Sequence, residues 1–317
     1  MNADQSAGKR SLKRNRRVSV ALIGIGVMLI FLSLFLVRSG RGQTTAPKES
    51  AVKPTIKVLP KTDPSRPDTA TSTFDEAILK NTAFRNELSW TFGGKQQRGW
   101  YLYDLLIRRT LDTPDEFDTA DFAFALSTWQ KRGRLNSSGI LDEESLMAMV
   151  SQWQSNRLKD KTPARPDQLV TAPSSDLYDP DRVAELRQVE RDTYAAYKRM
   201  ISAAINDRSL NLAHSSYTEL APTEKYFKIV SSFRSSEYQE ELRRRSPNAG
   251  TAGLAVNSPH FTGRALDLYV GGDPVDTKDT NRAIQVNSPA YRWLVRNAER
   301  FGFRPYFYEP WHWEYVR

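Results

Sequence analysis

The 317-residue chain has no cysteine and only three histidines, His214, His260 and His312. The absence of cysteine excludes a disulfide scaffold, a lipid-modified cysteine anchor, a thiol nucleophile and any cysteine-ligated zinc or iron–sulfur site. A transition-metal site in this chain must therefore be built from histidine and carboxylate side chains. With three histidines available, few such sites can be formed.

The larger part of the sequence also lacks an excess of charge of either sign. The net charge is +9, but residues 1–70 carry 13 Lys or Arg against 4 Asp or Glu, whereas residues 71–317 carry 33 of each. A groove that binds nucleic acid needs Lys and Arg clustered on the folded part of the chain. We therefore expect no nucleic-acid partner.

One long apolar run is present at residues 18–37, which number 20 and include no charged side chain. At about 1.5 Å per residue, a helix of this length crosses a hydrocarbon core about 30 Å thick. Six Lys or Arg side chains precede it within residues 9–17, a bias typical of a cytoplasmic flank. We expect a cytoplasmic basic tail (1–17), a single-pass anchor in the lipid bilayer of the cell membrane (18–37), and an extracytoplasmic remainder on the periplasmic or cell-wall side.

Two other interpretations of residues 18–37 are weaker. A cleaved signal peptide has a shorter apolar region and ends in small residues at the cleavage site, and this run ends in Leu-Phe-Leu-Val-Arg. A buried core helix of a globular domain is amphipathic, whereas this run is apolar on all sides. The composition therefore favours an uncleaved anchor.

Two polar stretches rich in proline separate the remaining regions. Residues 38–72 contain five prolines among Thr, Ser, Lys and Asp and have few bulky apolar residues to bury, which is typical of a linker. A flexible coil of this length reaches roughly 30 Å from the membrane. Residues 158–177 have a similar composition and are interpreted as a second linker.

The region between these linkers, residues 73–157, is expected to be a small helical domain. Apolar residues recur at i, i+3, i+4 and i+7 from Phe122 to Trp129, and Asp142 is placed to cap a second amphipathic helix. The run FALSTWQKRGRLNSSGILDEESLMAM resembles a helical peptidoglycan-binding module. A plain helical spacer whose aromatic residues form its core is the alternative.

The last region, residues 178–317, combines helix and strand patterns and is expected to have an α+β fold. Asp179–Pro180 predicts the start of a helix that continues to Ile201. Residues 264–270 alternate, so Asp267 faces away from the apolar side of its strand. Further strands are expected at 226–233 and 304–317 and further helices at 236–245 and 288–302. These elements predict a small, largely antiparallel sheet with flanking helices, preceded by the helical domain and the transmembrane helix.

Four residues of this region could form a catalytic metal site, namely His260, Asp267, Glu309 and His312. Two imidazoles and one carboxylate are a sufficient ligand set for a catalytic zinc, and a nearby carboxylate that is not a ligand can act as a base. Glu309 precedes Pro310 and is therefore biased toward an extended backbone. We expect Glu309 and His312 on a turn or strand end, unlike the single helix of the H-E-x-x-H proteases.

Each of these residues has an ordinary alternative when taken alone. A single histidine is more often a surface residue than a ligand, and an aspartate in an alternating strand usually belongs to its solvated face. For His214, in the polar run NLAHSSY, the surface interpretation is preferred.

The spacing of the four residues resembles a known family. Residues 258–267 have the pattern Ser-x-His-x-x-Gly-x-Ala-x-Asp and residues 309–312 have the pattern Glu-x-Trp-His. Together with the upstream segment SSFRSSEYQ, they resemble the zinc D-alanyl-D-alanine carboxypeptidases and dipeptidases, the VanY-like metallopeptidases, over about residues 224–317.

The resemblance implies a role for each matching residue. His260, Asp267 and His312 would bind Zn²⁺, and Glu309 would act first as general base and then as general acid. Arg234, in the upstream segment, would contact the substrate or the developing oxyanion.

Ser258 and Glu314 are expected to play smaller parts. Ser258 could bind substrate or support a ligand, and a structural role in the Ser258–Pro259 turn is equally open. Trp311 and Glu314 are interpreted as supporting residues of the site.

The expected function is that of a membrane-anchored zinc peptidase that hydrolyses the D-Ala-D-Ala bond of peptidoglycan stem peptides. The nearest alternative is an endopeptidase that cuts between L-Ala and D-Glu. A non-catalytic wall-binding protein and an iron(II) oxygenase, which also uses two histidines and one carboxylate, are alternatives of other classes.

Overall fold

The computed structural model describes residues 74–245 and 257–316 of the chain. The chain divides into two units, residues 1–62 and 63–317, and all described residues belong to the second. The expected tail (1–17), membrane anchor (18–37) and first linker (38–72) all lie outside the described residues. Among the helices within the described ranges, none is long and apolar enough to cross a membrane.

The first part of the described chain is mainly helical, as the periodicity predicted. Its helices are α1 (Asp75–Glu87), α2 (Asp104–Leu111), α3 (Ala120–Arg132) and α4 (Glu143–Ser155). Asp142 caps α4 as predicted, because its carboxylate accepts a hydrogen bond from the backbone N–H of Ser145 at 2.9 Å. Phe122 and Leu126 of α3 are fully buried, so the predicted apolar stripe faces the core of this part.

This region also contains a hairpin that the helical prediction missed. Strands β1 (Ser89–Phe92) and β2 (Lys95–Arg98) pair antiparallel and are joined by Gly93 and Gly94. Both glycines have positive φ, at 58° and 75°, as a two-residue hairpin turn requires. The Gly-Gly pair was the local signal for this hairpin.

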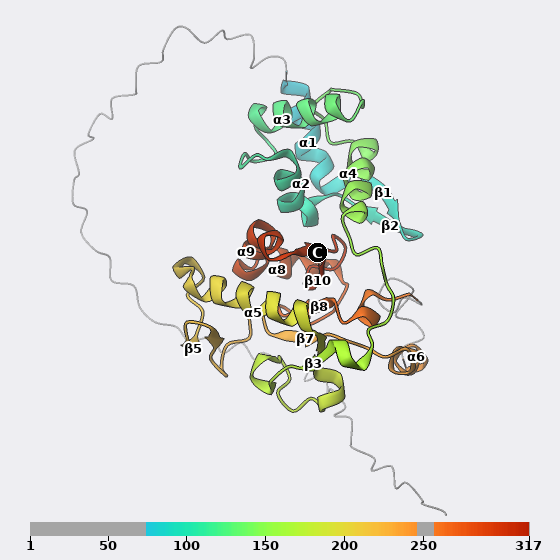
Figure 1. Ribbon diagram of the computed structural model, residues 1–317. Helices are drawn as coiled ribbons and strands as arrows, with labels where there is room; N and C mark the ends of the chain where they lie inside the picture. The colour runs from blue at the N-terminus through green and yellow to red at the C-terminus, as the bar shows by residue number, and fades with distance from the viewer. Residues whose placement is uncertain (1–73, 246–256, 317) are drawn as a thin grey trace, which may run out of the picture. The chain divides into compact units, whose positions relative to one another are not determined.

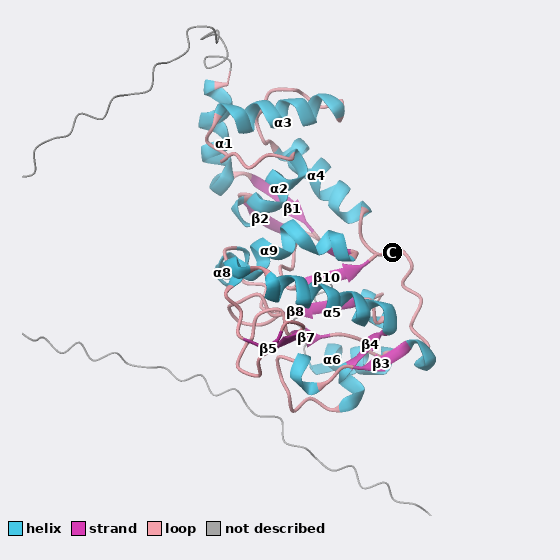
Figure 2. Ribbon diagram, turned by 60° about the vertical axis from the view of Figure 1, so that its left-hand side comes forward, coloured by secondary structure: helices cyan, strands magenta, loops and turns pink. Residues whose placement is uncertain are grey.

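The second part contains a four-stranded antiparallel sheet with the strand order β7-β8-β10-β9 (Figure 2). Its strands are β7 (Ile229–Ser231), β8 (Ala265–Leu268), β9 (Phe303–Pro305) and β10 (His312–Tyr315). Two smaller antiparallel pairs are β3 (Leu169–Thr171) with β4 (Gln188–Glu190), and β5 (His214–Ser216) with β6 (Glu219–Leu220). The expected α+β fold with small antiparallel sheets is confirmed.

Within the described residues, four helices accompany these sheets, together with short 3₁₀ turns (Figure 1). They are α5 (Arg191–Asn206), α6 (Ser236–Arg245), α8 (Asp279–Val286) and α9 (Pro289–Asn297). The 3₁₀ turns of the described chain are η2 (Tyr101–Tyr103), η3 (Pro166–Gln168), η4 (Ser174–Asp176), η5 (Ala184–Arg187), η6 (Arg208–Leu210), η7 (Pro259–Thr262) and η8 (Ala298–Phe301). Tyr291 of α9 contacts Trp313 of β10, so α9 packs on the face of β10 that carries Trp313. The other face of that strand carries His312 and Glu314.

The helix predicted from Asp179 begins twelve residues later. Asp179 and Pro180 lie in a turn in which the Asp179 carboxylate accepts from the N–H of Asp181 at 3.2 Å, an Asx turn rather than a helix cap. The helix α5 starts after Glu190, whose carboxylate accepts from the N–H of Thr193 at 2.8 Å. Residues 188–190 are held in strand β4 by their pairing with β3, and this long-range contact overrides the local cap signal.

The second expected linker, residues 158–177, is in part structured. It supplies strand β3, and Leu158, Ala172 and Leu177 are buried. Three prolines and many polar residues gave this segment a linker composition, but its few apolar side chains are the ones that pack.

Candidate active site

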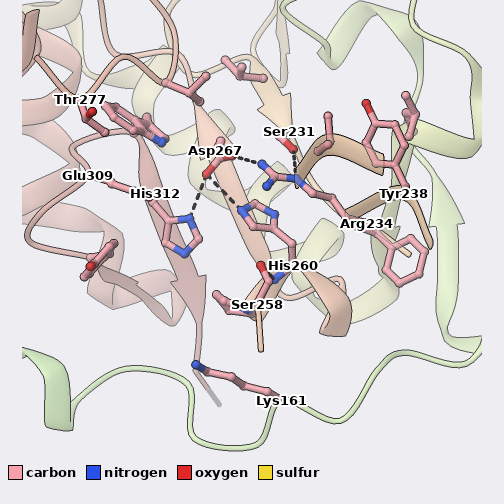
Figure 3. Close-up of a pocket in the computed structure, with 18 of the residues that line it drawn as sticks. Lys161, Ser231, Arg234, Tyr238, Ser258, His260, Asp267, Thr277, Glu309 and His312 are labelled. Carbon is pink, nitrogen blue, oxygen red and sulfur yellow. Dashed lines mark hydrogen bonds and ion pairs between the residues drawn. The ribbon is translucent and has the colours of Figure 1, made fainter. Parts of the chain in front are cut away.

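One cavity of about 580 Å³ collects the site residues that the sequence suggested (Figure 3). His260, Asp267, Glu309 and His312 line it, and so does Arg234. Three of these side chains are almost fully enclosed, with 2–4% of the residue exposed for His260, Asp267 and His312. Asp267 therefore does not belong to a solvated strand face, because that side of β8 is covered as well.

Strand pairing brings Asp267 and His312 together. The two residues are direct partners across the antiparallel strands β8 and β10. Side chains of directly paired residues project to the same side of a sheet. On β10 the neighbour Trp313 therefore points to the opposite face, and Glu314 returns to the face of His312.

His260 reaches the same point from the short turn η7, which precedes β8. Ser258 stands at the start of this turn, and its hydroxyl accepts from the N–H of His260 at 3.3 Å. Gly263 ends the turn with φ of 65°, and a Cβ placed on it would lie 2.8 Å from the backbone nitrogen of Glu190. The glycine of the Ser-x-His-x-x-Gly pattern is thus required by backbone conformation and by close packing.

The three candidate ligands converge on one point. Oδ1 of Asp267 lies 3.3 Å from Nε2 of His260 and 2.9 Å from Nδ1 of His312. One potential ligand atom from each residue lies within 4.8 Å of the other two. Figure 3 shows both imidazole rings directed at the Asp267 carboxylate. Two nitrogen ligands and one oxygen ligand at this separation fit a divalent transition metal such as zinc.

The other ring nitrogens of the two histidines have partners of their own. Nδ1 of His260 lies 2.7 Å from the carbonyl oxygen of Ser232, and Nε2 of His312 lies 3.2 Å from Oε1 of Glu314. Such outer contacts orient metal-binding histidines and set the tautomer that presents the ligating nitrogen. Here they direct Nε2 of His260 and Nδ1 of His312 toward Asp267.

Burial and neighbouring charges shift the pKa values of these groups. Burial, reinforced by the positive charge of Arg234, lowers the pKa of His260 to about 4, so this imidazole is neutral near pH 7. Burial also lowers the pKa of His312, but its hydrogen bonds to Asp267 and Glu314 outweigh burial and raise the pKa to about 9. A proton must therefore leave Nδ1 before His312 can bind a metal.

Asp267 is held in its ionised form. Burial alone would raise the pKa of this carboxyl, but the two histidines and Arg234 together hold it well below its usual range. An ionised carboxylate is the form that ligates a cation.

Glu309 lies in the loop between β9 and β10, directly before Pro310, as its sequence context predicted. Its backbone N–H donates to the carbonyl of Tyr306 at 3.1 Å, and its own carbonyl accepts from the N–H of His312 at 2.9 Å. The side chain is buried, and burial raises the pKa of Glu309 to about 7. A carboxyl with a pKa near the working pH can both accept and return a proton.

A known protein family matches the part of the chain that carries the candidate ligands. Residues 187–317 match the family model of VanY, D-alanyl-D-alanine carboxypeptidase. This part of the chain is therefore similar to the VanY family. The resemblance inferred from the Ser258–Asp267 and Glu309–His312 motifs is thereby confirmed, and so is the expectation of a carboxypeptidase-like enzyme.

Two solved structures are similar over part of the chain. One is a variant of the vancomycin-resistance D,D-pentapeptidase VanY from a VanB-type resistance cassette in complex with Zn(II), with 19% identity over 52% of this chain and 89% of that chain, and a TM-score of 0.29. The other is VanYB in complex with D-alanine-D-alanine, with 21% identity over 43% of this chain and 76% of that chain, and a TM-score of 0.27. A comparison with curated proteins finds no match.

Arg234 of the VanY-like region lies beside the candidate ligands. Its Nη2 donates to Oδ2 of Asp267 at 2.8 Å, and its Nε donates to the Ser231 hydroxyl at 2.9 Å. A guanidinium has five N–H donors, so these two contacts leave others for an incoming carboxylate or oxyanion. This position fits the role that the resemblance implied for Arg234, contact with the substrate or with the developing oxyanion.

The expectations for Ser258 and His214 have different outcomes. Ser258 lines the cavity and also caps the η7 turn through its hydroxyl, so contact with substrate and the structural role both stay predictions. His214 lies on the exposed strand β5, and its ring lies 6.3 Å from that of Tyr217. It is not among the residues that line the cavity.

The sequence underestimated one residue of the candidate site and missed two others. Glu314, expected only to support the site, is fully buried and contacts His312 directly. Its position two residues after a candidate ligand in a strand was the available signal. Ser232 acts through its backbone carbonyl, which no side-chain pattern indicates. Arg157, far upstream, also lines the cavity and had no local signal.

Proposed function

We propose that the chain is a zinc-dependent D-alanyl-D-alanine carboxypeptidase that hydrolyses the D-Ala-D-Ala bond of peptidoglycan stem peptides. The observation that carries this proposal is the convergence of His260, Asp267 and His312 in one cavity that Glu309 also lines. The match of residues 187–317 to a carboxypeptidase family supports the choice of bond.

The residues of the cavity can divide the work of peptide hydrolysis. His260, Asp267 and His312 would hold zinc, which when bound lowers the pKa of a water molecule and polarises the peptide carbonyl. Glu309 takes a proton from the attacking water and returns it to the leaving amine, since its pKa of about 7 suits both transfers. Arg234 stabilises the negative charge that develops on the carbonyl oxygen.

The test is incubation of the full-length chain with a pentapeptide wall precursor, with and without a chelator, followed by mass spectrometry. The proposal expects release of a single terminal D-alanine, its loss with the chelator and its recovery with added zinc. Cleavage between L-Ala and D-Glu would replace the proposed activity by that of an endopeptidase. The absence of any cleavage, with intact wall binding, would favour a non-catalytic wall-binding protein.

We propose further that residues 18–37 anchor the enzyme in the cell membrane with the cavity outside the cytoplasm. The support is the uncharged 20-residue run with a basic flank at residues 9–17. The linker at 38–72 would let the cavity reach nascent wall roughly 30 Å from the bilayer.

Fractionation and a fusion test this location. The chain is expected in the membrane fraction, and a reporter that is active only outside the cytoplasm is expected to work when fused after Arg317. A chain found in the soluble fraction, or a silent but intact reporter, would refute the anchor.

A further inference from the structure

One arginine outside the family-matching region reaches the candidate metal site. Arg157 follows α4 and lies upstream of residues 187–317. Its Nε donates to Oε1 of Glu314 at 3.0 Å, and its Nη2 donates to the same oxygen. The next residue adds a third contact, because the N–H of Leu158 donates to Oε2 of Glu314 at 2.9 Å.

Glu314 is the carboxylate that contacts His312. It is 0% exposed, and its Oε1 lies 3.2 Å from Nε2 of His312, on the side of the ring opposite the candidate ligand atom Nδ1. A buried carboxylate is stable only when its charge is compensated and its oxygens accept hydrogen bonds. Arg157 and Leu158 supply these contacts from outside the sheet.

Arg157 also packs against a second neighbour of His312. Its guanidinium carbon lies 3.9 Å from the centre of the Tyr306 ring, a cation–π contact. The Tyr306 ring in turn meets the His312 ring edge to face, with centroids 5.9 Å apart and an interplanar angle of 83°. Arg157 thus contacts both Glu314 and Tyr306, and each of these contacts the His312 imidazole.

The helical region touches the loop of the general base as well. Phe307, two residues before Glu309, has ring contacts with Phe92 at 4.7 Å, Tyr103 at 5.3 Å and Trp153 at 5.8 Å. These three aromatic residues belong to the part of the chain that precedes Arg157. The helical region therefore packs on the loop of the site and is not joined to it by a linker alone.

We propose that Arg157 is a positioning residue of the metal site, which holds Glu314 and thereby fixes the His312 ring with Nδ1 toward Asp267. The helical region upstream of residue 158 thus completes a site whose candidate ligands all come from residues 187–317. This inference rests on the proposed zinc-dependent function.

The test compares zinc affinity and kinetics of the full-length chain and of its variants. Loss of an outer contact to a metal-binding histidine typically lowers metal affinity or activity about 10- to 100-fold. Arg157→Ala is expected to weaken zinc binding by this factor, measured by competition with a chromophoric chelator, and to lower kcat more than it changes KM. Arg157→Lys should restore only part of the affinity, because an ammonium cannot reproduce the planar contact with Glu314 and Tyr306.

The matched control is Arg132→Ala, at the exposed C-terminal end of α3. It removes the same side chain from the same region without touching the cavity, and both zinc affinity and kcat should stay within twofold of the wild type. A similar loss of zinc affinity in this control would overturn the proposal.

A double-mutant cycle tests the route through Glu314. Glu314→Gln should weaken zinc binding, and Arg157→Ala combined with it should add little further loss, since both changes remove one contact. Additive losses, or an Arg157→Ala variant with zinc affinity within twofold of the wild type, would overturn the proposal. If Arg157→Ala does not fold, the same cycle is run with Arg157→Lys and Glu314→Gln. Additive losses of zinc affinity in that cycle would likewise overturn the proposal.

The two proposals fail in different ways. A wild-type chain that binds no zinc refutes the proposed function itself. A wild-type chain that binds zinc, with Arg157 variants that bind it equally well, refutes the positioning role alone.

Discussion

Nδ1 of His312 lies 2.9 Å from Oδ1 of Asp267, across two strands in which these residues are direct partners. The contact therefore depends on the register of β10 against β8. A shift of one residue would turn His312 to the face that Trp313 now occupies, because side chains alternate along a strand. The pairing of β8 with β10 thus brings two separate segments of the chain to one candidate metal site.

The first prediction concerns Glu309, the proposed general base. Glu309→Gln keeps the shape of the side chain but cannot accept a proton, so peptidase activity should fall by at least about 100-fold. Zinc affinity should remain within about twofold, because Glu309 is not among the three converging ligands. Steady-state kinetics and chelator competition measure the two quantities. An active variant would remove Glu309 from the mechanism.

The second prediction is the pH dependence of activity. A general base works in its ionised form, and burial raises the pKa of Glu309, the proposed base, to about 7. The fraction of ionised Glu309 therefore grows as the pH rises through 7, and kcat/KM should rise with it. A profile of kcat/KM from pH 5 to 9 should show an acidic limb centred near 7. A flat profile across this interval is the contrary result.

The third prediction concerns stability. Glu309 has a pKa of about 7 in the folded chain against 4.5 for the ordinary carboxyl. The folded state therefore binds this proton more tightly, and the carboxyl destabilises the fold progressively as the pH rises from about 4.5 to about 7. In chelator-treated protein, Glu309→Gln should be more stable than the wild type at pH 8, by up to about 3 kcal/mol.

Urea unfolding of both proteins at several pH values measures this difference. It should vanish near pH 4.5. Glu87→Gln, at the exposed end of α1, controls for the substitution itself. A variant no more stable than the wild type at pH 8 would argue against a buried, ionised Glu309.

The fourth prediction uses the small number of histidines. Zinc at 100 times its Kd should stabilise the wild type by about 2.7 kcal/mol, because zinc binds the folded state. His260→Ala should lose this stabilisation, which thermal unfolding with and without zinc detects. His214→Ala is the matched control, since His214 is exposed on β5, and it should respond to zinc as the wild type does. A His260→Ala protein that zinc stabilises fully would exclude His260 as a ligand.

The fifth prediction concerns the glycine of the first motif. Gly263→Ala places a Cβ 2.8 Å from a backbone nitrogen at a φ of 65°. The variant should lose about 1–3 kcal/mol of stability and some zinc affinity, because the η7 turn carries His260. Gly133→Ala is the control, because its nearest neighbour would be an ordinary 3.5 Å away and its φ of −78° suits alanine. Equal stability of the two variants would contradict this account.

Local patterns predicted much of the fold. Ser288 caps α9 as expected, with its hydroxyl accepting from the N–H of Tyr291 at 3.1 Å. Asp142 caps α4 in the same way. These signals lie within four residues of the structure that they specify, so the sequence alone reveals them. The start of α5 was wrong because the pairing of β3 with β4, which spans nearly twenty residues, decided it.

The sequence by itself determined the chemistry available to the protein. Because the chain has no cysteine and only three histidines, few residues other than His260 and His312 could be nitrogen or sulfur ligands of a metal. It also specified their motifs, because these depend on residue type and on short spacings. Only the tertiary structure decided that Asp267 is buried between both imidazoles and that Arg157 reaches Glu314 from 157 residues away. Contacts of that range arise from sheet register and from the packing of one region on another, and no local pattern in the chain encodes them.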